Sequence, residues 1–398
     1  MPGLHRSHTT ADAAVVSLIA SGRATTRAAI ARTLDWAPST VSIRVQQLID
    51  DGVLSQTDIK TGSRGRPASR LTLVPDGGCV VAVDLGGGHT HLAALSLAGQ
   101  IERRIDMPIT LADGPARVLE AIATQIDRLA TQMPPGCSLR TVGLAIPGPV
   151  DTSRGIVTLP ARMPGWAGFP VRDWLNDRLG VPIFMDNDAN LMAYGEHVVR
   201  QDGGDSTVTV KAGSGIGAGI IVDGAIYRGA TFAAGDITHY RVAAAGDAPC
   251  SCGNRGCLET IASGAALVEI LRAQGRAVTN TRDIVKLSRA GDPAVTTAVR
   301  AAGANLGQVL CAVVNFFNPR AIYVGGLLSS IEPFVAAVRA QVYQGSHPLV
   351  TRNLSVGRSR AGADGVLIGC GHLAIEQSLG GSDLLATLRK DEAYADAA

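Results

Sequence analysis

The 398-residue chain has no hydrophobic run long enough to cross a bilayer. Apolar stretches such as 13–20 and 217–222 are far shorter than the roughly 20 residues that a spanning helix needs. The N-terminus also lacks the pattern of a secretory signal peptide. These absences predict a cytoplasmic protein with no membrane partner.

The cysteines lack the even number that a disulfide framework requires. Three of the seven crowd between Cys250 and Cys257, and the other four stand alone in apolar surroundings. This distribution favours one metal site and several buried thiols over disulfides.

Charge is scarce as well, at 18% of residues against 46% hydrophobic, so the chain can bury a large core. Its length predicts two or three folded units. The net charge of +2 is unevenly divided: residues 1–70 hold nine Lys or Arg against five Asp or Glu, giving +4, and the remainder holds 27 against 29, giving −2. The excess of basic residues therefore lies in the N-terminal 70 residues.

The basic N-terminal segment contains three helical patterns, at 12–21, 25–34 and 39–51. A threonine is expected to cap the second helix and Ser39 the third. Short strands at 53–54 and 71–73 complete a winged helix-turn-helix. In this motif the second helix of the turn reaches base edges in the major groove. The alternative is a helical cap or dimerisation element with a solvated basic linker.

The third helix leaves small polar and basic side chains facing outward, which suits a major groove. A cationic, Gly- and Ser-rich segment, 60–70, lies between the wing strands, and its arginines suit phosphates or a narrow minor groove. The predicted DNA contacts are Thr26, Arg27, Ser39, Thr40, Ser42, Arg44, Arg64, Arg66 and Arg70.

Three glycine-rich turns follow strand-like runs in the rest of the chain. Backbone N–H groups in such turns can approach phosphate oxygens closely, and Asp84 is placed to hold a metal ion or its water shell. Together the turns predict a nucleotide cleft, although a single glycine turn also occurs in many ordinary hairpins. The predicted phosphate-binding residues are Asp84, Gly86, Gly87, Gly213, Gly215, Gly217, Gly325 and Gly326.

Asp186 and Asp188 lie where a strand ends and a helix is expected to begin near Leu191. An aspartate at a strand end can act as a general base. Aspartate is also a favoured helix cap, and the residues alone leave both roles open.

Cys250, Cys252 and Cys257 offer three thiolates in a tight loop, with His239 upstream as the fourth ligand. A Cys₃His set predicts one tetrahedral zinc ion per chain. Because four protein ligands leave no position for water, the zinc is expected to be structural. Free reduced cysteines are the alternative.

These residues carry a resemblance to ROK proteins (repressors, open reading frames and kinases) over essentially the whole chain. The cysteine motif is the most diagnostic of the matching segments. The segments are 84–87, 145–151, 164–166, 186–190, 213–217, 234–239, 250–259 and 318–326.

The resemblance implies an α/β fold in which the winged helix-turn-helix, 1–72, precedes an actin-like ATPase domain of the hexokinase type. Its first lobe is expected at 76–192, with a C-terminal helix, 375–395, packing back on it. The second lobe is expected at 193–374 and would carry the zinc site. A sugar would be held between the lobes.

The resemblance also implies sugar contacts from Asn187, Asp188, Asp236, His239 and Glu259, with His239 serving both zinc and sugar. In kinase members the residue matching Asp188 deprotonates the attacking hydroxyl.

The sequence departs from the kinase pattern at three positions. Gly88 stands where kinases usually have Thr, Asp236 where a sugar-binding Glu is usual, and Thr238 in place of a Gly. These departures predict a protein that is not an enzyme; ATP and Mg²⁺ would be cofactors only in a kinase.

The sequence therefore predicts a sugar-responsive transcriptional repressor that binds operator DNA as a homodimer or homotetramer, with a sugar or sugar phosphate as effector. An ATP-dependent sugar kinase is the alternative. A regulator that binds another protein through its effector face is a third hypothesis.

Overall fold

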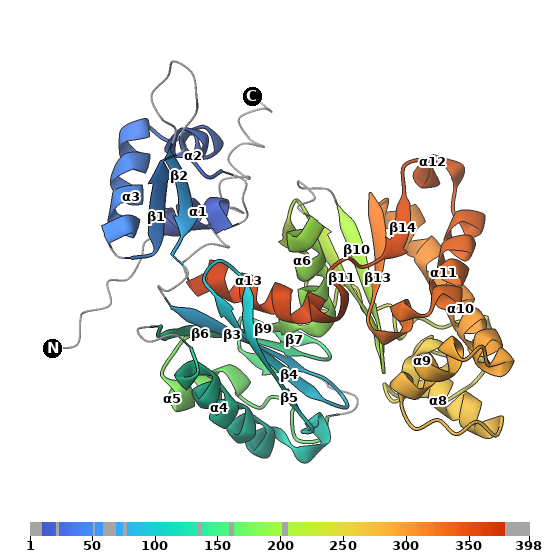
Figure 1. The fold of residues 1–398 in the computed structure, drawn as a ribbon. Helices are drawn as coiled ribbons and strands as arrows, with labels where there is room; N and C mark the ends of the chain where they lie inside the picture. Colours follow the sequence, from blue (N-terminus) through green and yellow to red (C-terminus); the bar gives the residue numbers. More distant parts are fainter. Residues whose placement is uncertain are drawn as a thin grey trace.

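The computed structural model describes residues 10–20, 24–50, 52–58, 69–74, 78–133, 137–158, 163–200 and 206–378. Within these ranges an N-terminal head with a two-stranded sheet precedes two α/β lobes, each built on a five-stranded sheet (Figure 1). The predicted α/β class is confirmed.

The head contains three helices and an antiparallel strand pair, as predicted. Val41, Val45 and Leu48 on the third helix are buried against the other two. The prediction that Ser39 caps this helix is wrong, because the helix begins at Pro38, whose fixed φ suits a first helical position. The elements are α1 Thr10–Ala20, α2 Arg27–Leu34, α3 Pro38–Asp50, β1 Leu54–Asp58 and β2 Ser69–Leu73.

The first lobe has a mixed sheet in the order β5-β4-β3-β6-β9. Side chains alternate across it, so that Val81 and Val83 meet α4 while Ala82 meets the helices on the opposite face. Its elements are β3 Cys79–Leu85, β4 Thr90–Ser96, β5 Ile101–Met107, η2 Leu111–Asp113, α4 Pro115–Thr131, β6 Leu139–Ile146, β7 Val150–Asp151, β8 Ile156–Val157, α5 Val171–Leu179 and β9 Ile183–Asn187.

The second lobe has a sheet in the order β12-β11-β10-β13-β14, with β10, β13 and β14 parallel. Its elements are α6 Asp188–Arg200, β10 Thr207–Ala212, β11 Ile216–Val222, β12 Ala225–Ile226, η3 Ala243–Ala245, α7 Glu259–Ala262, α8 Gly264–Ala273, α9 Thr281–Arg289, α10 Pro293–Phe317, β13 Ala321–Gly325, η4 Leu327–Ser330, α11 Glu332–Gly345, α12 Pro348–Thr351, β14 Ser355–Arg358 and η5 Gly362–Asp364.

Helix α10 is, among the described residues, the one helix long and apolar enough to span a membrane. Its apolar character has a structural explanation, because Val299, Leu306 and Leu310 are buried in the core of the second lobe.

The last described helix, α13 (Gly365–Ser378), returns to the first lobe and covers the face of its sheet that α4 leaves open. It packs along α6 with backbone against backbone: a Cβ on Gly195 would lie 1.9 Å from the Gly365 carbonyl oxygen, and one on Gly369 would lie 1.9 Å from that of Leu191. Any larger side chain at either glycine would force the helices apart. Residues 379–395 of the predicted C-terminal helix lie outside the described residues.

The head rests on this same helix (Figure 1). Ala374 and Ile375 of α13 join Leu18 and other buried residues of the head in one apolar cluster, together with Val80 and Leu97 of the first lobe. The head is therefore packed directly onto the element that contacts both the first sheet and α6.

Candidate functional site

Two predicted carboxylates meet where the two lobes join. Asp84 is the penultimate residue of β3, and Asp188 is the first residue of α6, directly after β9. The structure adds a residue that the sequence analysis missed: Lys211, on the central strand β10, forms an ion pair with Asp188 through Nζ and Oδ2. A lysine within the apolar run 207–212 was the available signal, because charged residues are rarely buried without a partner.

The electrostatics of this group depend on burial. Burial raises the pKa of Asp84, an effect that the Lys211 ammonium opposes and the Asp188 carboxylate reinforces. Burial works against the charge of Lys211, but the two carboxylates outweigh it and raise the pKa of the ammonium. Asp84 Oδ1 is buried without a hydrogen-bond partner among the described residues.

Asp186 and Asn187 take structural roles at the start of α6. Asp186 pairs with Arg228 at 2.7 Å and accepts a hydrogen bond of 3.0 Å from Asn190 Nδ2. Asn187 Oδ1 accepts from the backbone N–H of Ala189 at 2.9 Å, which is the capping role considered for the two aspartates. Helix α6 also begins at Asp188, three residues before the predicted Leu191.

Glu259 lies beside the turn between β10 and β11. Its Oε2 accepts hydrogen bonds from Thr238 Oγ1 at 2.6 Å and from the Ile216 N–H at 3.3 Å. Thr238, one of the departures from the kinase pattern, thus occupies one acceptor site of this carboxylate. Asp236 is exposed.

The predicted glycine turns differ in how open they are. A Cβ on Gly87 or Gly213 would meet nothing within 4 Å, so both turns leave room for a ligand. A Cβ on Gly325 would lie 2.6 Å from Met192 Sδ, and Gly326 has a φ of +80°. The third turn therefore needs its glycines for packing and backbone conformation.

The predicted metal ligands come together. The ligand atoms of His239, Cys250, Cys252 and Cys257 all lie within 4.8 Å of one another, and His239 Nδ1 is 3.5 Å from Cys250 Sγ. Burial and the neighbouring thiols raise the pKa of the Cys257 thiol to about 12. Three sulfurs and one imidazole nitrogen converging in this way could hold a metal ion, whose charge would favour the thiolates.

The third helix of the head presents the predicted polar face. Ser39, Thr40 and Ser42 are exposed, and so is Ile43, with 61% of its surface accessible, which the sequence analysis did not include. Arg44 is half-buried and pairs with Asp12 of α1 at 3.2 Å.

The remaining predicted DNA contacts have more varied surroundings. Thr26 caps α2 by accepting from the Ala29 N–H, and Arg27 donates to Gln56 of the wing. Arg70 is exposed on β2. Arg64 and Arg66 lie outside the described residues.

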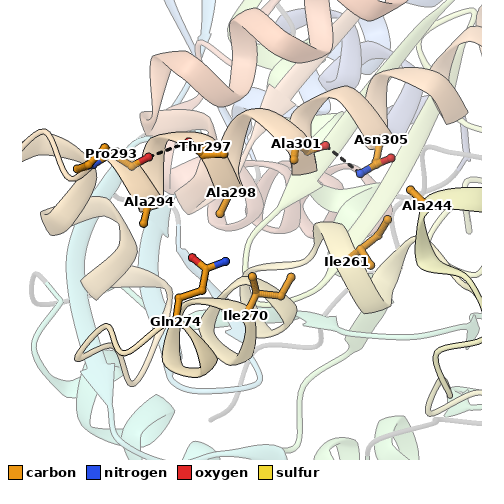
Figure 2. Close-up of a pocket in the computed structure, with 10 residues that line it drawn as sticks. All are labelled: Ala244, Ile261, Ile270, Gln274, Pro293, Ala294, Thr297, Ala298, Ala301 and Asn305. Carbon is orange, nitrogen blue, oxygen red and sulfur yellow. Dashed lines mark hydrogen bonds between the residues drawn. The ribbon is translucent and has the colours of Figure 1, made fainter.

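A separate hollow of about 540 Å³ lies on the second lobe, lined by α10, α8 and the neighbouring segments (Figure 2). None of the predicted sugar, phosphate or metal residues lines it. Its lining is largely apolar and comprises Ala244, Ile261, Ile270, Gln274, Pro293, Ala294, Thr297, Ala298, Ala301 and Asn305.

Comparison with known proteins defines the class to which these lobes belong. The ROK family model matches residues 80–377, and the chain therefore belongs to the ROK family. The actin-like ATPase fold expected of that family is confirmed by its solved members.

Individual relatives match different lengths of the chain. A xylose repressor of Caldicellulosiruptor bescii is 27% identical over 92% of this chain and 95% of its own. A glucokinase of Halalkalibacterium halodurans is 30% identical over 75% of this chain and 95% of its own. The crystal structure of a ROK family transcriptional regulator, a homologue of E. coli MLC, superposes with a TM-score of 0.77 at 24% identity, covering 93% of this chain and 96% of its own.

Proposed function

We propose that this protein is a sugar-responsive transcriptional repressor of the cytoplasm. The observation that carries the proposal is the packing of a winged helix-turn-helix head onto α13, the helix that also contacts the sheet of Asp84 and the helix of Asp188. A change at the cleft and a change in the head can therefore be linked through one element. The similarity to repressors extends over the head, whereas the glucokinase match covers only 75% of the chain.

In this proposal α3 reads operator DNA in the major groove. Small exposed side chains at Ser39, Thr40 and Ser42 allow close approach to base edges, and the Ile43 side chain can contact a thymine methyl group. Phosphate contacts would come from Thr26, Arg27, Arg64, Arg66 and Arg70. Arg44 would act chiefly by holding α3 on α1 through Asp12.

The effector is a monosaccharide or its phosphate, bound by Asn187, Asp188, Asp236, His239 and Glu259. The buried carboxylate of Glu259 suits this task because an unpaired buried polar group penalises a wrong epimer by about 1–3 kcal/mol. Gly86, Gly87, Gly213, Gly215 and Gly217 would form the remains of a phosphate-binding cradle around the same cleft.

The metal centre holds one structural zinc ion in this proposal. Four protein ligands complete a tetrahedral shell, so the ion would stabilise the loop between His239 and Glu259 without activating water. It would thereby fix the two ends of the segment that carries the proposed sugar ligands.

The proposed units are the head at 1–72, the first lobe at 76–192 with the returning C-terminal helix, and the second lobe at 193–374. A homodimer or homotetramer would match a palindromic operator, because half-site spacing is set by the distance between two heads. Sugar would shift the balance between two arrangements of those heads by its differential affinity for them, typically worth about 1–3 kcal/mol.

The test is a titration of the full-length protein against its own upstream DNA, with and without monosaccharides, sugar phosphates and ATP. We expect specific binding that one sugar changes without ATP. Ser42→Ala should weaken specific binding, while Thr297→Ala, which removes a hydroxyl from the exposed side of α10, should not.

A sugar kinase is the second candidate, favoured by the retained Asp84 and Asp188 and by the open turns at Gly87 and Gly213. It replaces the repressor if no DNA binds, a sugar is phosphorylated, and Asp188→Asn abolishes turnover.

A further inference from the structure

Lys211 lies on β10 between two glycines of the neighbouring strands. In the register of the sheet, its neighbours are Gly217 on β11 and Gly325 on β13, and cross-strand partners project from the same face. The lysine is therefore flanked on both sides by residues without side chains. A Cβ on Gly217 would lie 3.1 Å from Ala189, and one on Gly325 would lie 2.6 Å from Met192, both residues of α6. This face of β10 is thus turned toward α6.

The ammonium reaches the first residue of that helix, which is an unusual place for a positive charge. A helix N-terminus carries a partial positive charge and favours anions. Lys211 is held there by the carboxylate of Asp188, which it contacts, and by the nearby charge of Asp84. Two negative charges and one positive charge therefore share the junction of the lobes.

A divalent cation does not fit this group. Mg²⁺ in phosphate-transfer sites is bound by one or two carboxylates together with waters and substrate phosphates. Asp84 has a buried oxygen with no hydrogen-bond partner in the described part of the chain, which would suit such an ion, but its neighbour Asp188 is already paired with the ammonium. A dication beside Asp84 would also face the Lys211 charge in a poorly solvated site.

We propose that Lys211 is a resident cation that takes the place of a divalent metal ion between Asp84 and Asp188, so that the cleft binds an uncharged sugar without a metal-bound nucleotide. The inference rests on the proposed function and specifies its effector. A sugar hydroxyl can accept a hydrogen bond from the ammonium and donate one to Asp188, so this pair matches its two capacities. A phosphate dianion has no proton to donate to the carboxylates. With Asp84 ionised, the three side chains carry a net charge of −1, which repels the dianion.

The metal experiment uses the full-length, zinc-loaded protein and Mn²⁺ as a spectroscopic substitute for Mg²⁺. Electron paramagnetic resonance should find no Asp84-dependent Mn²⁺ binding in the native protein or in Lys211→Arg, which keeps the charge. Lys211→Met should bind Mn²⁺ at least about tenfold more tightly than the native protein does, and the added change Asp84→Asn should abolish this binding. Circular dichroism establishes that each variant is folded.

Two outcomes of this experiment overturn the proposal. One is Asp84-dependent Mn²⁺ binding by the native protein, which decides the matter even if Lys211→Met does not fold. The other is a folded Lys211→Met variant that binds no Mn²⁺.

A calorimetric titration of the native protein tests the ligand class. An uncharged monosaccharide should bind in the absence of Mg²⁺ and ATP, and more tightly than its phosphate ester. Tighter binding of the ester would overturn this part of the inference. Failure to bind operator DNA would instead contradict the proposed function and leave the metal and sugar results standing, so the two failures are distinguishable.

Discussion

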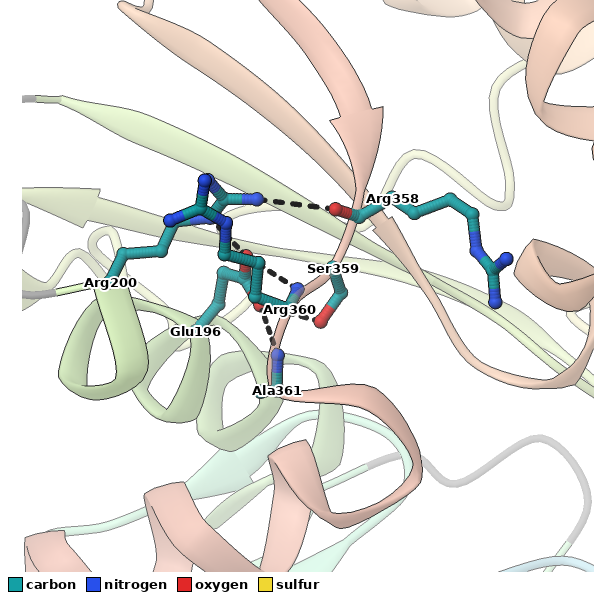
Figure 3. A network of polar contacts seen from close by, with 6 residues as sticks. All are labelled: Glu196, Arg200, Arg358, Ser359, Arg360 and Ala361. Atoms are coloured by element: carbon teal, nitrogen blue, oxygen red, sulfur yellow. Dashed lines mark hydrogen bonds and ion pairs between the residues drawn. The ribbon is translucent and has the colours of Figure 1, made fainter.

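Glu196 Oε2 accepts a hydrogen bond of 2.9 Å from the backbone N–H of Ala361, and this contact fastens α6 to the segment that leads into α13 (Figure 3). The same carboxylate accepts from the Arg360 N–H at 2.9 Å and from Ser359 Oγ at 2.6 Å, and it pairs with Arg200. Although burial favours its neutral form, these partners hold the pKa of Glu196 below its ordinary value. One buried charge therefore holds α6 to the connection between β14 and α13.

Glu196→Gln should lower the free energy of unfolding by about 2–3 kcal/mol, because an amide N–H would replace one acceptor oxygen opposite buried donors. Urea denaturation at neutral pH measures the loss. Glu102→Gln, the same chemical change on the exposed strand β5, should leave the midpoint unchanged. Equal midpoints for the native protein and Glu196→Gln would contradict the role given to this carboxylate.

The Glu196 contribution should also depend on pH. Since its pKa is lower in the folded than in the unfolded protein, the stabilisation is fully present above the ordinary glutamate value of ~4.3 and is lost as the pH falls toward the folded-state pKa. The urea midpoint of the native protein should therefore approach that of Glu196→Gln on acidification. A difference between the two that widens in acid would exclude this linkage.

The metal centre makes a second prediction. Cys252→Ser should lose zinc and lower the melting temperature, because a structural zinc site contributes its binding energy to folding. Metal analysis of the purified protein should find one zinc per chain before the change and little after it.

Cys137→Ser is the matched control, since it removes a thiol that is not part of the cluster. It should retain its zinc. Native protein purified without zinc, or Cys252→Ser with a full complement, would show that the four residues are not a zinc site.

The sequence predicted local elements better than it predicted contacts between residues that are far apart along the chain. The hydrophobic period of α3 and the spacing of Cys250, Cys252 and Cys257 are visible in short segments, and the structure agrees with both. The pairing of Lys211 with Asp188 joins residues 23 positions apart on different elements, and no local pattern specifies it. The fold itself decides which carboxylate the lysine reaches.

The same reasoning applies to the two roles considered for the aspartates before α6. Asp186, Asn187 and Asp188 are adjacent and all are suitable caps, so composition could not separate them. Only the path of the chain gives capping to Asn187, an arginine partner to Asp186 and a lysine partner to Asp188.

Arg70 provides a prediction about DNA. Because it is exposed on a wing strand and is proposed to contact a phosphate, Arg70→Ala should weaken binding about equally for specific and unrelated DNA. The slope of log affinity against log salt concentration should fall in magnitude by about 0.9 for each phosphate that the variant no longer neutralises. Fluorescence anisotropy over a salt series measures both quantities.

Arg103→Ala removes an equal charge from the exposed face of β5 and should leave the slope unchanged. If the two variants have the same slope, Arg70 makes no phosphate contact. If Arg70→Ala weakens only the specific complex, the residue reads base edges instead.

Ile375 lies on the helix that packs against both the head and the sheet of Asp84, and it tests how the head and the proposed sugar site communicate. Its side chain is 1% exposed on α13, in the cluster that includes Leu18 of α1, while other residues of α13 pack against the first sheet and α6. Ile375→Ala should destabilise the protein by about 2–5 kcal/mol and loosen this contact. The change that a sugar causes in DNA affinity, about 5–150-fold in typical allosteric proteins, should shrink toward none.

Ile122→Ala makes the same truncation on α4, which packs on the opposite face of the first sheet, and should keep the sugar effect despite a comparable loss of stability. Because the two variants differ in position and not in chemistry, an undiminished sugar effect in Ile375→Ala would mean that the signal reaches the head by a route other than α13.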